Sequence, residues 1–275
     1  MKIQKLFSTT FILMLVFTLA ACNLPGGAPL GGPTPTPTRL GGSSPDDGGS
    51  GSPGGGIGGG SGSCANPLWP VVSGAYWSYE SNDSVLGQYT FTSTVTEVGT
   101  DGFGLTNEYS TGVTAAQAWQ CQAGNLISLS VGGGTAATLS TDNGTNAHTE
   151  TTGNSGVTLP ALVSPGDAWS QTMNLSGTVT LTDGNSGSSE GAYVADYSAV
   201  GIESISVPAG SFEAMRIEMN SVYTLNITVE GMTVPTVVNN AATLWYAPGV
   251  GLVMSVNTND IMGTETITLT GYNVP

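Results

Sequence analysis

Alternation of side chains with a period of two residues is the feature that most limits what this chain can fold into. In the stretch GQYTFTSTVTEV (87–98), aromatic, aliphatic and small residues alternate with threonine. The same period recurs in three further stretches, at 174–184, 221–231 and 263–272. Successive side chains of a strand point to opposite faces, and Thr, Val, Tyr and Ile suit a half-buried pleated surface. The pattern therefore predicts β-strands, and almost no stretch has the period of a helix.

Short turn signals separate these runs, among them TDG, NG, DNG and PG. Strands joined repeatedly by short turns indicate an antiparallel sheet with one wet face. We expect the segment 232–240 to be an edge strand or a crossing, because Pro235 cannot donate to a central ladder. Three stretches rich in small polar residues are predicted as loops, at 132–136, 141–156 and 184–190.

One phrase is written twice in the chain, about half the folded length apart. AAQAWQCQAGNLISLSV (115–131) and AATLWYAPGVGLVMSV (241–256) both open with Ala-Ala, reach Trp four positions on, and place Leu and then Ile or Val after it. A Gly-x-x-Trp-Ser segment precedes each copy, at Trp77 and at Trp169. The interpretation is a duplicated antiparallel unit, and chance similarity in a chain rich in Gly, Thr and Ser is the alternative.

The duplication predicts an all-β, mainly antiparallel fold. We expect a strongly curved sheet or half-barrel with little helix, built from two diverged repeats at about 64–140 and 157–275. Packing two such units side by side would place Trp119 and Trp245 at equivalent positions on one concave or core face.

The N-terminus has the pattern of a bacterial secretion signal at residues 1–21. Lys2 and Lys5 precede the apolar run FILMLVFTLA, which is too short to be read as a membrane span. The run ends in LAAC, which resembles a lipobox, so Cys22 is the predicted lipidation site. The alternative is an ordinary secretory peptide with an incidental cysteine.

Residues 22–63 are predicted to be the lipidated cysteine followed by a disordered tether. This stretch is rich in Gly, Pro and Ser, and it offers too little apolar surface to offset the entropy of ordering its backbone. The folded part is then 64–275, with Cys64 and Cys121 as its only cysteines. In an oxidising compartment an even pair indicates a disulfide, and two separate buried thiols are the alternative.

The charge of the folded part excludes several classes of partner. After Arg39 the only Lys or Arg is Arg216, whereas seventeen Asp and Glu residues lie between Glu80 and Glu265. Nothing is available to neutralise a phosphate backbone, so we predict no nucleic-acid partner. The acidity fits solubility outside the cell. Calcium binding by acidic loops at 141–150 and 182–190 is the alternative, but neither has EF-hand spacing, and no metal site is predicted.

The sequence offers little support for catalysis. His148 is the only histidine, and the chain has no G-x-S-x-G, H-E-x-x-H or C-x-x-C motif. We therefore predict a protein that is not an enzyme and has no cofactor; a hydrolase with two converging carboxylates is a remote alternative. The candidate ligand-binding residues are Trp119, Trp245, Tyr246 and Arg216. Core filling by the aromatic residues and a structural ion pair for the arginine are the alternatives.

Three segments resemble a known family. SGAYWSYES (73–81), VPAGSFEAMRIEM (207–219) and TLWYAPGVGLVMSV (243–256) look like the signature segments of TapB-like, or DUF3108-like, bacterial lipoproteins. The resemblance implies a strongly curved antiparallel half-barrel of the kind found in envelope lipoprotein carriers and chaperones. It implies no catalytic residues.

These observations together predict a lipid-anchored protein of the cell envelope. It is expected on the extracytoplasmic side of the cell membrane or outer membrane, attached through its N-terminal lipid. Its curved sheet is expected to bind or present an apolar ligand or an envelope partner protein. The alternative is a carbohydrate-binding or adhesive module that uses exposed Trp and Tyr.

Overall fold

The computed structural model describes residues 62–129, 131, 136–140, 146–181, 183–260 and 263–275. The predicted signal peptide, the lipidation site Cys22 and all of the tether up to residue 61 lie outside the described residues. Within the described part there is one short 3-10 turn, η1 (Gly62–Cys64), and no α-helix. No helix in this part is long and apolar enough to span a membrane.

Thirteen strands form a single sheet in which every pair of neighbours is antiparallel, in the order β5-β4-β3-β2-β1-β13-β12-β11-β10-β9-β8-β7-β6. This confirms the predicted all-β antiparallel fold with a strongly curved sheet. The strands are β1 (Tyr76–Asp83), β2 (Gly87–Val98), β3 (Gly102–Tyr109), β4 (Thr114–Gln122), β5 (Asn125–Ser128), β6 (Ala136–Ser140), β7 (Asn146–Gly156), β8 (Ala168–Thr180), β9 (Ser186–Val207), β10 (Gly210–Val229), β11 (Met232–Ala247), β12 (Gly251–Asn259) and β13 (Gly263–Asn273).

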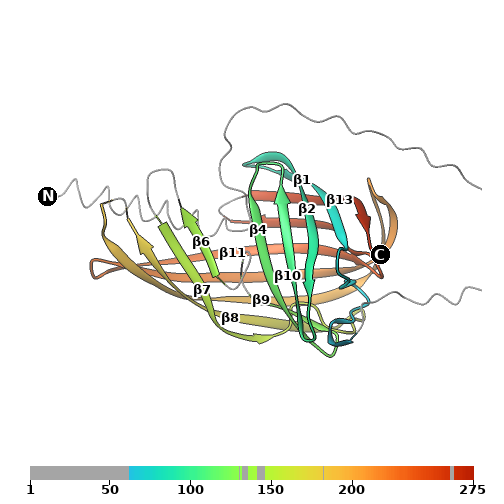
Figure 1. Cartoon of the computed structure of the whole chain (residues 1–275), viewed down its shortest axis with the longest axis horizontal. Helices are drawn as coiled ribbons and strands as arrows, with labels where there is room; N and C mark the ends of the chain where they lie inside the picture. The colour runs from blue at the N-terminus through green and yellow to red at the C-terminus, as the bar shows by residue number, and fades with distance from the viewer. Residues whose placement is uncertain (1–61, 130, 132–135, 141–145, 182, 261–262) are drawn as a thin grey trace, which may run out of the picture.

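The strands differ greatly in length, and this divides the molecule into two regions. β9, β10 and β11 have 22, 20 and 16 residues, about twice the length of β1 or β12. β12 pairs with β11 only from Asn240 to Ala247. The rest of the long strands continues beyond the short ones and carries β7 and β6 with it (Figure 1). We call this continuation the arm, and the region that contains β1–β5, β12 and β13 the barrel.

The barrel closes on itself at one end. β5 is the last strand of the ladder, but its Leu126 forms an isolated antiparallel bridge with Leu159, in the segment between β7 and β8. The Leu126 amide donates to the Leu159 carbonyl at 2.9 Å. The side-chain amides of Asn154 and Gln171 donate to the Ser128 carbonyl at 2.6 and 2.8 Å. The sheet therefore curls further than a half-barrel, and the exposed edge of β5 is capped.

Glycine allows neighbouring strands of the arm to approach each other closely. A Cβ atom on Gly191 would lie 2.0 Å from the carbonyl oxygen of Thr224, and one on Gly177 would lie 2.1 Å from the carbonyl oxygen of His148. Real Cβ atoms do not approach backbone oxygens this closely, so only glycine fits where neighbouring strands are pressed together.

A segment that precedes the sheet fills the closed end of the barrel. Residues 64–75, which we call the plug, bury Leu68, Val71 and Ala75 against the inner face of the sheet, the face that carries the buried core. A second apolar cluster lies in the arm and consists of Val179, Leu181, Leu225, Ile227 and Val229. Side chains of the chain itself therefore occupy both parts of the inner face.

Two of the three predicted loops are wrong over most of their length, because they form strands. Residues 146–156 of the expected 141–156 loop form β7, and residues 186–190 of the expected 184–190 loop belong to β9. In the third, at 132–136, Ala136 already begins β6. Segments such as NAHTETTGNSG (146–156) lack apolar alternation, but their neighbours in the sheet supply the pairing that their own composition does not indicate. The remaining residues of these loops, 132–135 and 141–145, lie outside the described part.

The edge prediction at Pro235 is confirmed, because no described strand pairs with 232–239 on the side away from β10. The expectation that Trp119 and Trp245 share one face is wrong. Trp119 packs on the inner face, but Trp245 pairs with Arg216 and lies on the opposite face from Ile217. The repeat itself stays a prediction. Tryptophans stand on the first and fourth strands of both β1–β5 and β8–β12, and Trp169 packs against the core as Trp77 does, so only Trp245 departs from its counterpart.

Candidate functional site

The plug is tied to both sides of the barrel closure. Cys64 and Cys121 form a disulfide, which confirms the predicted pairing and links the plug to β4. Asn66 is fully buried, and its side-chain amide donates to the carbonyls of Gly124 and Pro160 at 2.9 and 3.0 Å. Its carbonyl oxygen accepts from the backbone amides of Leu68 and Trp69. Asn66 therefore joins the plug, the β4–β5 turn and the segment before β8.

The plug also carries an aromatic hub. The ring of Trp69 lies 5.3 Å from Trp119, 6.1 Å from Tyr246 and 6.2 Å from Trp77, measured between ring centroids. Trp119 and Tyr246 are 7% and 8% exposed. Two of the four predicted ligand-binding residues thus lie in the core, where their rings pack against other rings of the chain.

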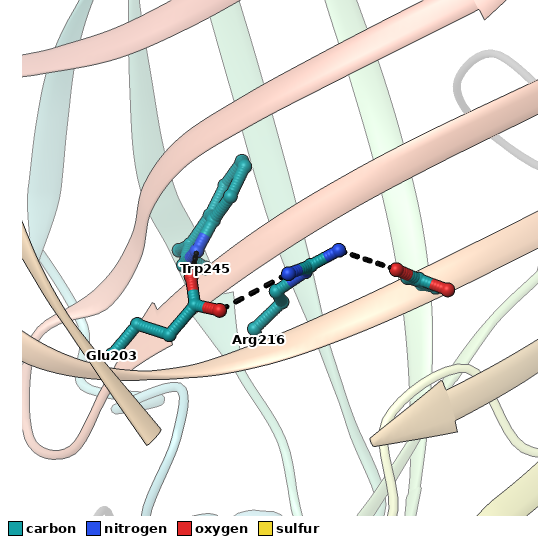
Figure 2. A network of polar contacts seen from close by, with 4 residues as sticks. Glu203, Arg216 and Trp245 are labelled. Carbon is teal, nitrogen blue, oxygen red and sulfur yellow. Dashed lines mark hydrogen bonds and ion pairs between the residues drawn. The ribbon is translucent and has the colours of Figure 1, made fainter. Parts of the chain in front are cut away.

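The other two predicted residues form a polar network on the opposite face of the long strands (Figure 2). Arg216 on β10 binds Glu203 on β9 at 3.1 Å and Glu218 on its own strand at 2.5 Å. The indole N–H of Trp245 donates to the second carboxylate oxygen of Glu203 at 2.9 Å. The hydrogen bond from Trp245, followed by the one from Arg216, lowers the pKa of the Glu203 carboxyl.

This network holds the three strands together and leaves little free capacity for an external anion. Both terminal nitrogens of the Arg216 guanidinium already bind carboxylates, and its side chain is 32% exposed. The four predicted residues therefore do not converge on one site. Ligand contact by any of them stays a prediction.

The barrel end opposite the plug has a polar and aromatic inner face that sequence reasoning missed. Glu265 on β13 accepts hydrogen bonds from Ser81 at 2.7 Å and from the hydroxyl of Tyr89. Burial raises the pKa of Tyr89, and the bond to Glu265 adds to the effect. Burial also raises the pKa of Tyr109, whose ring lies 6.1 Å from that of Tyr89. Alternation within 87–98 separated the aromatic residues from the threonines, but it gave no sign of the carboxylate that meets them from the far end of the chain.

The described residues contain no cluster of three or more His, Cys, Asp or Glu side chains that could hold a metal ion. The acidic turn at 182–190 uses its groups internally, because Asn185 binds Asp183 and also donates to Glu230 at 2.8 Å. His148 lies on β7 rather than in a loop, with Glu150 at 3.0 Å.

An open depression lies where the arm leaves the barrel. It has a volume of about 320 Å³ and is bordered by β10, β11 and the end of β12. Asp260 closes one side, accepting from the backbone and side-chain amides of Asn239 at 3.2 and 2.8 Å. The rest of the lining consists of Asn220, Ser221, Val222, Asn240, Ala241 and Thr258.

Comparison with known proteins gives one family match. The sequence model described as DUF3108-like matches residues 88–264. This range covers nearly all of β2, β3 to β12 and the first two residues of β13, and it leaves out β1. A comparison with curated proteins found no match.

Comparison with solved structures gives three similar chains. A "putative lipoprotein" from Parabacteroides distasonis ATCC 8503 is 15% identical, with 76% of this chain and 99% of that chain covered and a TM-score of 0.43. A "putative exported protein with YmcC-like fold" from Bacteroides fragilis NCTC 9343 is 14% identical, with 75% and 98% covered and a TM-score of 0.39. The "hypothetical lipoprotein YmcC" from Escherichia coli K12 is 11% identical, with 73% and 85% covered and a TM-score of 0.30. Identities and scores this low do not bear on function.

Proposed function

The chain belongs to the DUF3108-like family, and from that premise we propose that it is a non-enzymatic lipoprotein of the cell envelope. Lipid on Cys22 holds it to the cell membrane or outer membrane, and a flexible tether carries the sheet on the extracytoplasmic side. The sheet presents a surface to an envelope partner protein. The lipobox LAAC and the Gly/Pro/Ser-rich segment that follows it support the anchor and the tether.

The observation that carries this proposal is the place where the tether joins the sheet. The described chain begins at Gly62, and the Gly124 amide donates to the Ser63 carbonyl at 2.7 Å beside the Cys64–Cys121 disulfide. The tether therefore leaves from the plugged end of the barrel. The arm lies at the other end of the sheet, away from this attachment point (Figure 1).

The filling of the inner face favours a protein partner over an apolar cargo. Trp77, Ile217 and Leu225 are each 1% exposed, and Ile227 and Leu269 are fully buried. Side chains of the chain itself occupy the space where a carrier would hold its ligand. The glycan-binding alternative finds no specific support, because Trp77 and Trp119 are buried and the other three tryptophans are partly buried against neighbours.

Metabolic labelling with an alkyne analogue of palmitate tests the anchor. We expect label on the wild-type chain in the membrane fraction, and neither label nor membrane retention for Cys22→Ala. A Cys64→Ser/Cys121→Ser variant is the control and should keep the label. Label that persists in Cys22→Ala would contradict the proposal.

Mass spectrometry of organic extracts tests the choice between partner and cargo. We expect no apolar molecule in stoichiometric amount with the purified full chain, beyond the lipid covalently bound at Cys22. A lipid found in those extracts in stoichiometric amount would contradict the presentation of a surface to a partner protein and would indicate that the protein carries lipid.

A further inference from the structure

The outer edge of β11 in the arm is a length of strand with one neighbour. Residues 232–239, which we call the arm edge, pair with β10 throughout, and the register has no bulge. β12 joins β11 only at Asn240, and in the described part of the chain no other strand lies along the arm edge. One side of this backbone is therefore available for pairing.

The hydrogen bonds at Asn239 show which backbone groups face outward. Its N–H donates to the carboxylate of Asp260 at 3.2 Å, and its C=O accepts from the Asp260 amide at 3.2 Å. Backbone groups alternate in direction along a strand, so Val237, Pro235 and Thr233 also direct theirs away from β10. The arm edge thus offers the C=O groups of all three residues and the N–H groups of Val237 and Thr233.

Exposed valines on β9, β10 and β11 form a row that ends at this edge. Val194 on β9 and Val222 on β10 are cross-strand partners and are 38% and 39% exposed. Val237 on β11 is on the same face and is 55% exposed. A strand added beside β11 would extend this row of valines with its own side chains on that face.

Both ends of the arm edge carry negative charge. Glu230 lies in the turn just before it, and Asp260 caps its other end. The only Lys or Arg of the described residues is Arg216, which already binds two carboxylates. The two acidic ends are separated by eight residues of strand, roughly 26 Å.

We propose that the arm edge binds, by strand addition, an extended basic segment of the partner protein. The segment spans about seven residues, alternates β-branched or apolar residues with polar ones, and has Lys or Arg at both ends. Backbone pairing along the edge supplies affinity, and the acidic ends set the register and select a basic sequence. This inference rests on the proposed function in one respect: the bound segment is taken to belong to a partner protein of the envelope.

Two occupants from this chain are disfavoured by charge. A second copy paired antiparallel at the arm edge would bring Glu230 of one molecule toward Asp260 of the other, and like charges in such positions are repulsive. Pro235, near the middle, would also withhold a donor from that pairing. The tether contains a single cation, Arg39, and cannot place positive charge at both ends.

The test measures binding of a fluorescent peptide, acetyl-Lys-Thr-Val-Thr-Val-Thr-Val-Lys-amide, to the full chain in non-ionic detergent. Two further peptides carry N-methyl groups on alternate amides, one on the odd and one on the even positions. Only one set of amides can face β11, so we expect one methylated peptide to lose affinity by tenfold or more and the other to bind as the parent does. Equal loss or equal retention in both, or no saturable binding of the parent peptide, would overturn the proposal.

Charge variants test the acidic ends with the same peptide. Glu230→Gln and Asp260→Asn should each weaken binding by roughly two- to fivefold and reduce its salt dependence. Glu97→Gln, on β2 at the plugged end, is the matched control and should change nothing. An equal effect of all three variants would mean general adsorption to an acidic protein and would refute the site. Because the assay needs no lipid anchor, a failure here is distinguishable from a failure of lipidation at Cys22.

Discussion

Replacing Asn66 by alanine tests whether the buried amide of the plug holds the barrel closed. The side chain is fully buried and makes four hydrogen bonds, to Gly124, Pro160, Leu68 and Trp69. The variant leaves four backbone groups in a closed interior without their partner. At a net value of about 1 kcal/mol for each bond, the expected loss in the free energy of unfolding is about 3–4 kcal/mol. This is near the upper limit for a single substitution.

Equilibrium unfolding in urea, followed by tryptophan fluorescence with the disulfide intact, measures this loss. With a slope of about 2–3 kcal/mol per molar urea, the midpoint should fall by roughly 1–2 M. Asn66→Asp should be at least as damaging, because a carboxylate would face the carbonyls of Gly124 and Pro160 in a buried site. Asn226→Ala, at an exposed position on β10, is the control and should change stability by less than about 0.5 kcal/mol. A loss below about 1 kcal/mol for Asn66→Ala, or an equal loss in the control, would refute the role of Asn66.

Three further predictions concern the disulfide, the buried tyrosines and the surface network. Reducing the Cys64–Cys121 bond, which closes a loop with a sequence separation of 57, should lower the free energy of unfolding by about 4 kcal/mol; matching urea midpoints before and after reduction would contradict this. Burial raises the pKa of Tyr79. The neutral Tyr79 therefore stabilises the folded state fully below the unfolded-state pKa of about 10, and this stabilisation is lost as pH rises above that value. Absorbance at 295 nm should therefore show tyrosines that ionise only as the sheet unfolds, and complete ionisation of a folded protein would argue against this burial. The hydrogen bonds from Trp245 and Arg216 lower the pKa of Glu203. The ionised Glu203 therefore stabilises the folded state above the usual carboxyl pKa of about 4.5, and this stabilisation is lost as pH falls through the lower pKa of the folded state. Glu203→Gln should flatten the acid limb of the stability curve relative to wild type, and an unchanged limb would show that other carboxylates dominate it.

If the arm edge binds a basic strand, the unequal strand lengths of the sheet acquire a functional reason. β12 stops at Asn259, whereas β11 begins with eight residues, 232–239, that no described strand covers from that side. Proline and charge at an edge are also common defences against aggregation, and here Pro235 and Asp260 restrict pairing without abolishing it. A site that rejects its own copy and accepts a basic partner would combine both roles.

Local sequence was sufficient for the class of fold. Period-two alternation with short turn signals predicted the antiparallel sheet, and the missing N–H of Pro235 predicted an edge, because both depend on the geometry of a single strand. An even pair of cysteines after a secretion signal predicted the Cys64–Cys121 bond for a similarly local reason, the redox state of the compartment.

Tertiary structure alone decided which side chains meet. Alternation states that neighbours point in opposite directions but does not say which face is buried, and a shift of one residue exchanges the two faces. The two copies of the Ala-Ala-x-x-Trp phrase therefore have different environments in the fold. Trp119 lies in the core, whereas Trp245 lies beside Arg216, on the opposite face from Ile217. Closure at Leu126 and Leu159 also depends on contacts between distant parts of the chain, which no local pattern records.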